Sequence, residues 1–322
     1  MAEIAVLGAG AWGTALALVA ARDGHPVRLW ARDPEAAEAI NAARENRARL
    51  PGVRLPACIR ATPDLAALQG AKLMVAAVPA QAVRGMAEAL AKFLPPDVPM
   101  VLCAKGIERG SGAFLTEIVS QYLPRTPLAV LSGPSFAEDV AVGLPTAVTL
   151  ACAQPTVFDL CREALGAPWF RLYHSTDLRG VEIGAAAKNV LAIACGMAAG
   201  RKLGGSANAA LIARSFAELA RFGRAYGARP ETLTGLSGLG DLVLTCQPGK
   251  SRNFAFGEAL GRGETPPATL AEGAFTAPVL ADLARARDVD MPITFAVDAI
   301  LKGETSVGAA ITALLARPSR SE

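Results

Sequence analysis

Short apolar runs alternate with helical patterns over the first half of the chain, and helical patterns alone fill the second half. The runs in the first half are short enough for buried strands. The predicted strands cover residues 4–7, 27–31, 72–79, 99–104, 128–131, 146–151 and 169–173. Because strands that alternate with helices form parallel sheets, we expect an α/β domain with a doubly wound sheet.

From about residue 177 the periodicity is helical throughout. The segment 209–226 carries Leu219 and Phe222 on one apolar stripe, as an amphipathic helix does. Further helices are expected over residues 231–234, 253–260, 276–287, 293–301 and 307–316. A chain of 322 residues fits two domains. We therefore expect an N-terminal α/β domain over residues 1–176 and an all-α domain over residues 177–322.

A glycine-rich turn (GAGAWG, residues 8–13) joins the first predicted strand to the first predicted helix. Gly8 permits the tight turn, Gly10 lets the backbone approach a pyrophosphate, and Gly13 lets helix and strand pack closely. The helix start offers N–H donors and the positive end of its dipole to phosphates. This order predicts that the N-terminal domain is Rossmann-type and binds a dinucleotide.

The second predicted strand ends without the acidic residue that holds the ribose in NAD-specific sites. Its end reads Trp30-Ala31-Arg32, and Asp33 is better explained as a helix N-cap because Pro34 follows it. Arg32 is the residue type that pairs with a 2′-phosphate or stacks on adenine. We therefore expect NADP to be accepted, with NAD as the alternative.

Composition narrows the classes of function. The chain is 52% hydrophobic and 19% charged, which provides for large cores and argues against disorder. A net charge of +3 without a basic run argues against a nucleic-acid partner. The six cysteines show no C-x-x-C spacing and the only histidines are His25 and His174, so we expect no metal site.

The most apolar later run, residues 183–199, contains Lys188 and two glycines. It falls short of a membrane span. The sequence begins directly in a predicted strand, with no pattern of a signal or transit peptide. We therefore expect a cytoplasmic protein without a membrane span.

Lys188 is the only charged residue between Glu182 and Arg201. An ammonium group inside such an apolar helix costs free energy unless it is paired or deprotonated. A lysine of this kind can accept a proton from a hydroxyl as hydride leaves the same carbon. The alternative is a lysine whose ammonium reaches solvent along the helix surface. With Asn189 beside it and few histidines in the chain, we interpret Lys188 as the catalytic residue.

A second polar cluster follows later in the helical domain. Asp241 lies between glycines and an apolar run, which suits a carboxylate held near a cation or a substrate hydroxyl. Ser251, Arg252 and Asn253 precede a predicted helix, where such side chains can hold a phosphate. The competing explanation is that one of them only caps the helix. Together with Lys188, the cluster predicts a phosphorylated hydroxy substrate.

Six motifs appear in order along most of the chain, from residue 4 to about residue 275. They are GAGAWGT (8–14), KGIE (105–108), SGPSFA (132–137), KN (188–189), GLGDL with TC (238–242 and 245–246), and SRN (251–253). This set resembles the bacterial NAD(P)-dependent sn-glycerol-3-phosphate dehydrogenases. Position 11 is alanine where that family more often has serine, and position 271 is alanine where it usually has valine.

The resemblance implies reversible conversion of sn-glycerol 3-phosphate to dihydroxyacetone phosphate, which supplies glycerophospholipid synthesis. It also implies a homodimer and Lys188 as proton acceptor. The substrate residues that it implies are Lys105, Gly133, Ser135, Lys188, Asp241, Ser251, Arg252 and Asn253. The predicted cofactor residues are Gly8, Gly10, Ala11, Trp12, Gly13, Arg32, Arg49, Lys105, Ala137, Arg252 and Glu272; of these, Arg49 matches only loosely.

Two alternatives remain open at this point. One is a related hydroxy-acid dehydrogenase of the 6-phosphogluconate or 3-hydroxyisobutyrate type, which also uses an active-site lysine but lacks the KGIE and SRN motifs. The other is a non-catalytic protein that senses NAD(P). The intact lysine and the phosphate cradle argue against this sensor.

Overall fold

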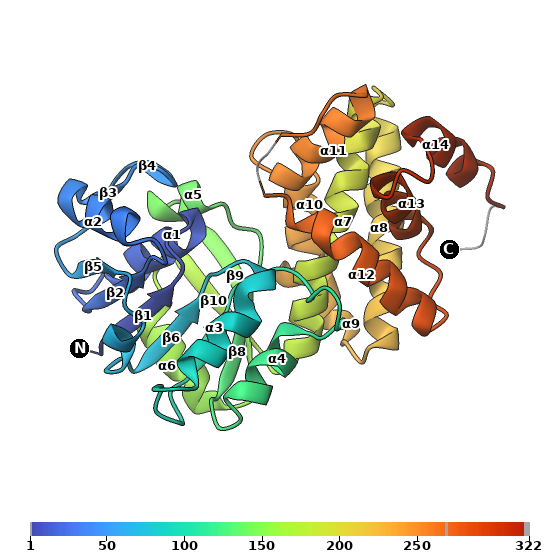
Figure 1. The fold of residues 1–322 in the computed structure, drawn as a ribbon. Coiled ribbons are helices and arrows are strands. Elements are labelled where there is room, and N and C mark those ends of the chain that lie inside the picture. Colours follow the sequence, from blue (N-terminus) through green and yellow to red (C-terminus); the bar gives the residue numbers. More distant parts are fainter. Residues whose placement is uncertain (1, 268–269, 319–322) are drawn as a thin grey trace. The chain divides into compact units, whose positions relative to one another are not determined.

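The computed structural model describes residues 2–267 and 270–318 and divides into two compact units (Figure 1). Unit 1 comprises Met1–Lys105 and Ala113–Glu182, and unit 2 comprises Gly106–Gly112 and Ile183–Glu322. The division falls inside one long helix, α7 (Leu178–Gly200). At that point the backbone is helical, whereas the segment 106–112, which belongs to unit 2, is joined to unit 1 at both ends outside helices and strands.

Unit 1 is built on an eight-stranded sheet with the order β10-β9-β8-β7-β6-β1-β2-β5. Its strands are β1 (Ile4–Leu7), β2 (Val27–Trp30), β5 (Ile59–Thr62), β6 (Leu73–Ala76), β7 (Met100–Leu102), β8 (Leu128–Ser132), β9 (Thr146–Cys152) and β10 (Phe170–Ser175). All neighbours from β5 to β8 pair in parallel, and so do β9 and β10. The pair β8 and β9 is antiparallel.

The expectation of a purely parallel sheet is therefore wrong at one junction. The connection from β8 to β9 contains only the short helix α5 (Ala137–Ala141) in place of a full crossover helix, so the chain reverses direction. Ser132 at the end of β8 pairs with Thr149 in β9. The early part of β9 consequently lies beside the carboxyl end of β8, at the edge where the parallel strands end.

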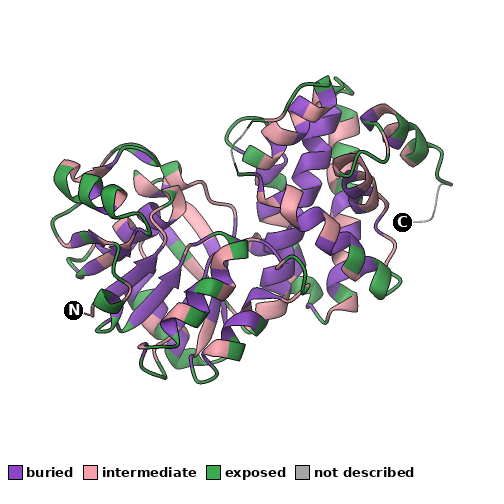
Figure 2. Ribbon diagram, viewed as in Figure 1, coloured by how far each residue is buried: buried purple, intermediate pink, exposed green. Residues whose placement is uncertain are grey.

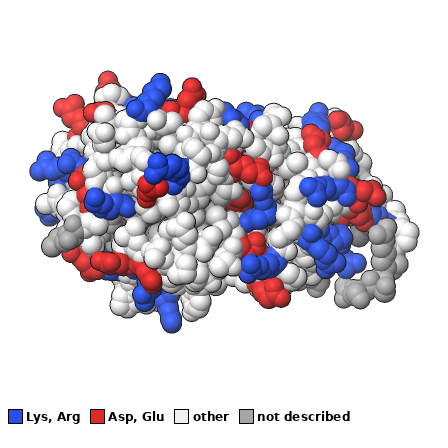
Figure 3. Space-filling view, turned by 90° about the horizontal axis from the view of Figure 1, so that it is seen from below, with Lys and Arg blue, Asp and Glu red and all other residues white. Residues whose placement is uncertain are grey.

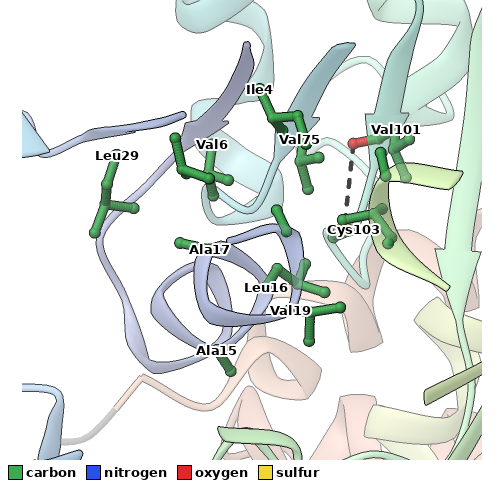
Figure 4. Packing of buried hydrophobic residues seen from close by; sticks show 14 of the residues in the cluster. Ile4, Val6, Ala15, Leu16, Ala17, Val19, Leu29, Val75, Val101 and Cys103 are labelled. Atoms are coloured by element: carbon green, nitrogen blue, oxygen red, sulfur yellow. Dashed lines mark hydrogen bonds between the residues drawn. The ribbon is translucent and has the colours of Figure 1, made fainter. Parts of the chain in front are cut away.

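Helices cover both faces of this sheet: α1 (Ala11–Ala20), α2 (Pro34–Ala43), α3 (Val83–Leu90), α4 (Leu115–Tyr122), α5 and α6 (Pro155–Leu165). In β1, Ile4 and Val6 lie in one core cluster with Leu16 of α1 (Figure 4). The alternate residue Leu7 belongs to a second cluster, with α3 and α4. A strand that is buried on both faces needs a continuous apolar run, which explains the sequence of β1.

Two features of unit 1 lie between the predicted elements. A short hairpin is formed by β3 (Glu45–Asn46) and β4 (Leu50–Arg54), and the edge strand β5 follows it. Neither the hairpin nor β5 is among the strands predicted from the sequence. By contrast, the expected N-cap is confirmed: the Asp33 carboxylate accepts a hydrogen bond of 3.0 Å from the Glu35 N–H at the start of α2.

The part of unit 2 that the structure describes is helical. Its helices are α7, α8 (Gly205–Ala225), α9 (Pro230–Thr234), a π-helical turn (Leu236–Gly240), α10 (Asp241–Thr245), α11 (Arg252–Arg262), α12 (Glu272–Ala286), α13 (Pro292–Leu301) and α14 (Val307–Leu315). The helix α7 is long and apolar enough to cross a membrane, with a mean hydropathy of 1.4 over an 18-residue window, but 89% of that window is buried inside the protein. Figure 2 shows this burial along α7. We therefore assign α7 as the core helix of unit 2.

Glycines let α7 and α11 approach closely. A Cβ atom added at Gly196 would lie 2.1 Å from the Phe254 carbonyl oxygen, and one added at Gly257 would lie 2.0 Å from the Ile193 carbonyl oxygen. Gly200 and Gly261 make equally close approaches. Each helix thus presents a small-x-x-x-small pair to the other, so backbone packs on backbone. This packing holds α11 along the last two turns of α7.

A buried carboxylate joins two other helices of unit 2. Glu218 of α8 is 1% exposed and accepts hydrogen bonds from the N–H groups of Ile293 (2.6 Å) and Thr294 (3.1 Å) at the start of α13. Burial raises the pKa of this carboxyl to about 7, against the lowering effect of those hydrogen bonds. In unit 1, burial likewise raises the pKa of Glu182 to about 7.

Glu218→Gln is expected to flatten the pH dependence of unit 2 stability. The folded-state pKa of about 7 lies above the ordinary value of 4.5, so the folded protein keeps a proton that the unfolded chain releases between these values. The free energy of unfolding therefore falls as pH rises through this window, by at most about 3 kcal/mol for this group. Urea unfolding at pH 5.5 and 8 measures the change; an unaltered slope in the variant would contradict the assignment.

Candidate active site

The glycine turn of unit 1 has two glycines that the protein itself requires. A Cβ at Gly8 would lie 2.8 Å from the Ala77 carbonyl oxygen, and φ there is +110°. A Cβ at Gly13 would lie 1.9 Å from the Gly8 carbonyl oxygen. At Gly10, in contrast, an added Cβ would meet no protein atom within 4 Å. The space beside Gly10 is open, which fits a group that approaches the backbone from outside.

The start of α1 also fits a bound pyrophosphate. Gly10 is the N-cap and makes no side-chain capping hydrogen bond, and the first turn holds no acidic residue. Ala11 and Trp12, the first residues of α1, are half-buried, and the indole N–H of Trp12 is buried beside the Cys103 thiol. The backbone N–H groups of a helix start have no acceptor within the helix and lie at the positive end of its dipole, so they suit an anionic ligand.

Apart from Arg49, the other predicted residues of unit 1 follow the carboxyl ends of its parallel strands. Arg32 follows β2 and is exposed, and Lys105 follows β7 and is half-buried. The Lys105 ammonium donates to the Gly133 carbonyl oxygen at 3.3 Å, and the Ser135 hydroxyl donates to the same oxygen at 3.1 Å. Ala137 is the first residue of α5. The structure thus brings Lys105, Gly133 and Ser135 together at one point of the sheet edge.

Packing against β9 explains why position 133 is a glycine. A Cβ there would lie 2.8 Å from the Cα of Val148 in β9, so the antiparallel pairing of β8 and β9 excludes a side chain at this position. Arg49 lies in the turn of the β3–β4 hairpin and is exposed. Its hairpin is attached to the glycine turn by Asn46, a residue that the sequence does not point to because it lies between predicted elements.

Unit 2 holds the lysine in a buried polar network. Lys188 is 5% exposed and Asp241 1% exposed. The ammonium of Lys188 donates to Asp241 Oδ1 and, at 2.9 Å, to the hydroxyl of Thr245. That hydroxyl donates to the Asp241 carbonyl oxygen at 2.6 Å. The ion pair compensates for removing the ammonium from water, and Thr245 fixes the direction in which the nitrogen points.

A second network ties the motif residue Asn253 to two other helices. Its amide donates to Asn189 Oδ1 of α7 at 3.0 Å, and its Oδ1 accepts from the Gly273 N–H at 2.9 Å. Asn253 therefore supplies the N-terminal capping contact of α12 from outside that helix. The network places Asn189, Asn253 and the first residue of α12, Glu272, around the same part of α7.

The remaining motif residues occupy the start of α11. The Ser251 hydroxyl accepts from the Phe254 N–H at 3.2 Å, so this serine acts as the N-cap, as the competing explanation held. Arg252, the first residue of the helix, is exposed. Of the predicted cofactor residues, Arg252 and Glu272 lie in unit 2 and all others in unit 1. The predicted substrate residues are also divided between the units: Lys105, Gly133 and Ser135 lie in unit 1, and Lys188, Asp241, Ser251, Arg252 and Asn253 lie in unit 2.

Three other features bear on the chemistry of the site: possible metal ligands, a buried thiol and the surface charge. No group of three or more His, Cys, Asp or Glu side chains that could hold a metal ion occurs within the described residues. A hydrogen bond with the Cys195 thiol, together with burial, raises the pKa of Cys246, so that thiol stays neutral near Lys188. On the face that Figure 3 shows, acidic and basic side chains are interspersed.

Comparison with known proteins shows the family to which this chain belongs. Residues 3–158 match the model of the NAD-dependent glycerol-3-phosphate dehydrogenase N-terminus, and residues 177–312 match that of its C-terminus. A relative from Bradyrhizobium diazoefficiens named glycerol-3-phosphate dehydrogenase (NAD(P)+) is 58% identical over 321 residues, which cover 99% of this chain and 98% of the relative. The chain belongs to the NAD-dependent glycerol-3-phosphate dehydrogenase family.

Solved structures agree with this membership. A glycerol-3-phosphate dehydrogenase from Coxiella burnetii is 39% identical, with a TM-score of 0.95 over 98% of this chain and 99% of that one. The enzyme from Saccharomyces cerevisiae is 26% identical, with a TM-score of 0.84 over 96% of this chain and 98% of that one.

The family membership decides several of the expectations drawn from the sequence. The resemblance, the α/β Rossmann-type domain followed by a helical domain, the NAD(P)-dependent dehydrogenase class and the NAD(P) cofactor are confirmed. Because the chain belongs to this family, we reject the two alternatives, an enzyme of the 6-phosphogluconate or 3-hydroxyisobutyrate type and a non-catalytic sensor.

Proposed function

We propose that the chain interconverts sn-glycerol 3-phosphate and dihydroxyacetone phosphate, with Lys188 as the residue that moves the proton. The observation that carries this proposal is the buried contact of Lys188 with Asp241 and Thr245. A buried lysine held by a carboxylate and a hydroxyl is placed for proton transfer rather than for solubility. In the cell the reaction supplies glycerol 3-phosphate for glycerophospholipid synthesis.

A nicotinamide cofactor held at the glycine turn would supply the hydride chemistry at C2 of the substrate. Lys188 transfers the proton. When dihydroxyacetone phosphate is reduced, the ammonium of Lys188 donates a proton to the C2 oxygen of the substrate. In the reverse direction, the neutral amine of Lys188 takes that proton back. Asp241 stabilises the ammonium form, and Thr245 keeps the nitrogen aimed in one direction.

Recognition of the substrate phosphate is assigned to cationic and amide groups. Arg252 is exposed at the first turn of α11, where a guanidinium and the N-terminal end of an eleven-residue helix both favour a dianion. Asn253 holds the start of this helix against α7 and α12. In unit 1, Lys105 with Gly133 and Ser135 forms a second polar group, which we assign to the substrate hydroxyl and to the cofactor.

The cofactor assignment uses the open space at Gly10 together with Ala11, Trp12 and Arg32. We propose that NADP is bound with Arg32 on its 2′-phosphate, because β2 ends without a free acidic residue: the Asp33 carboxylate is engaged in capping α2. Arg49, Ala137 and Glu272 complete the proposed cofactor contacts. The ratio of kcat/KM for NADPH and NADH measures this preference.

Three further assignments belong to the same proposal. Residues 1–176 form the dinucleotide-binding domain and residues 177–322 the helical substrate-binding domain, although some of the assigned substrate residues lie in the first domain and some of the assigned cofactor residues in the second; this is consistent with the position of the glycine turn in unit 1 and of Lys188 in unit 2. We propose a homodimer on the basis of the family resemblance. A cytoplasmic location is supported by the burial of α7, whose apolar character the core of unit 2 explains.

The decisive experiment follows NADPH absorbance after dihydroxyacetone phosphate is added to purified protein. We expect rapid oxidation, and its absence at micromolar protein would overturn the proposal. Arg252→Ala is the informative variant: losing one bidentate phosphate contact should raise the KM for dihydroxyacetone phosphate by about tenfold or more. Arg262→Ala, at the other end of α11, is the control and should leave this KM unchanged.

A further inference from the structure

We infer that Asn46 is a positioning residue for the dinucleotide, which holds the glycine turn and the Arg49 turn in one fixed arrangement. The inference rests on the proposed function in one respect, namely that the glycine turn and Arg49 bind the cofactor. Neither the family resemblance nor the sequence motifs assigned a role to Asn46.

Asn46 is 3% exposed and uses both protons of its amide on the glycine turn. One goes to the Ala9 carbonyl oxygen at 3.0 Å, and the other goes to the Thr14 hydroxyl oxygen at 2.8 Å. The Thr14 hydroxyl in turn donates to the Gly10 carbonyl oxygen at 2.8 Å. These hydrogen bonds therefore fix the carbonyl groups of Ala9 and Gly10, next to the open space beside Gly10.

Fixed carbonyl groups also fix the peptide N–H groups that follow them, because each peptide unit is planar. The carbonyl of Gly10 and the N–H of Ala11 belong to one such unit. If the Gly10 carbonyl is held, the N–H of Ala11 points in one direction at the start of α1. Holding donors in place before a phosphate arrives removes an ordering cost from binding.

The same asparagine anchors the turn that carries Arg49. The Arg49 N–H donates to the Asn46 carbonyl oxygen at 3.1 Å, so the turn closes on the anchored residue. The hairpin is stiffened further by Glu45, whose carboxylate accepts the Gly52 N–H at 2.8 Å, and by Leu50, which is 1% exposed. Arg49 itself is exposed. Its guanidinium is thus carried on a rigid hairpin attached to the phosphate-binding turn.

Only an amide suits this position. It offers two N–H donors from one nitrogen, whereas a serine offers one and an ionised aspartate offers none. An aspartate would also place a carboxylate against the carbonyl oxygen of Ala9 and add negative charge near the phosphates. The residue type at position 46 is therefore determined by the glycine turn and not by the hairpin alone.

The test measures direct NADPH binding by fluorescence, which does not depend on catalysis. Asn46→Ala should raise the Kd for NADPH by about tenfold, corresponding to the loss of roughly one buried hydrogen-bond contact, and leave kcat at saturating cofactor within about twofold. Asn41→Ala is the matched control, because Asn41 makes a similar pair of bonds to the backbone of Ala61, at 2.8 and 2.9 Å, between α2 and β5. It should leave the Kd unchanged.

Two further measurements separate positioning from general destabilisation. Thr14→Val, which lacks the hydroxyl, should reproduce part of the rise in the Kd for NADPH. Thr14→Ser, which keeps the hydroxyl, should have the wild-type Kd. Asn46→Ala combined with Arg49→Ala should raise the Kd by less than the product of the single effects, since Arg49 loses its placement when Asn46 is removed.

An unchanged Kd in Asn46→Ala, an equal rise in Asn41→Ala, or multiplicative single effects would each overturn the inference. Failure of the proposed reaction is visible separately, as wild-type protein that binds NADPH without oxidising it.

Discussion

Lys188→Ala is expected to lower kcat by about 10²- to 10⁴-fold, the range that a general acid–base residue contributes. The reason is that Lys188 supplies the ammonium that Asp241 and Thr245 hold in the buried network, so alanine removes the group that gives and takes the proton. NADPH binding should persist, because the glycine turn lies in unit 1. Stopped-flow measurement of hydride transfer, together with NADPH fluorescence, gives both quantities.

The variant also leaves Asp241 buried without its partner, which alone can destabilise a protein by about 3–5 kcal/mol. The double variant Lys188→Met/Asp241→Asn removes both charges at similar volume and should recover most of that stability. It should remain inactive. Near-normal turnover in either protein would remove Lys188 from the mechanism, and activity that returned with stability would show a structural role only.

Lys188 could be predicted from the sequence because a single charge in a long apolar helix is conspicuous at the level of residue types. The contacts of its partners could not be predicted in the same way: the sequence indicates Asp241 as a carboxylate near a cation or a substrate hydroxyl, but not that it pairs with Lys188. Asp241 and Thr245 lie 53 and 57 positions further along the chain, and only the packing of α10 against α7 brings them to the lysine. The sequence therefore indicated the reactive group, while its charge compensation depends on tertiary structure.

The hairpin shows a second limit of sequence reasoning. Strand β4 contains Pro51 and Gly52, residues that normally argue against a strand, and β3 is only two residues long. No local pattern of hydrophobic positions could reveal such a pair. The strand direction of β9 was missed for a related reason, because alternation and burial predict that a strand exists but not which way it runs.

Asn46 and the glycines of α7 and α11 belong to a third class. Their residue types are dictated by close contacts with distant backbone, such as Asn46 with Ala9 or Gly257 with Ile193. The sequence contains the spacing of Gly196 with Gly200 and of Gly257 with Gly261. That spacing becomes informative only when the two helices are known to face each other.

Gly257→Ala is expected to destabilise unit 2 by about 3 kcal/mol or more, at the upper end of what overpacking produces. The new Cβ would lie 2.0 Å from the Ile193 carbonyl oxygen and 2.8 Å from its carbon. Both are backbone atoms inside a helix and cannot rotate away, so α7 and α11 must separate. Urea unfolding monitored by circular dichroism measures the loss.

The matched control is Gly308→Ala in α14, where the nearest atoms to an added Cβ are side-chain atoms at 3.9 and 4.0 Å. Alanine is the better helix former by about 1 kcal/mol, so this variant should be neutral or slightly more stable. Separation of α7 from α11 should also displace Asn253 from Asn189; the side-chain nitrogen of Asn253 lies 3.0 Å from Asn189 Oδ1. Gly257→Ala should therefore raise the KM for dihydroxyacetone phosphate even where the protein remains folded, whereas equal stability of the two variants would show that α7 and α11 do not depend on backbone contact.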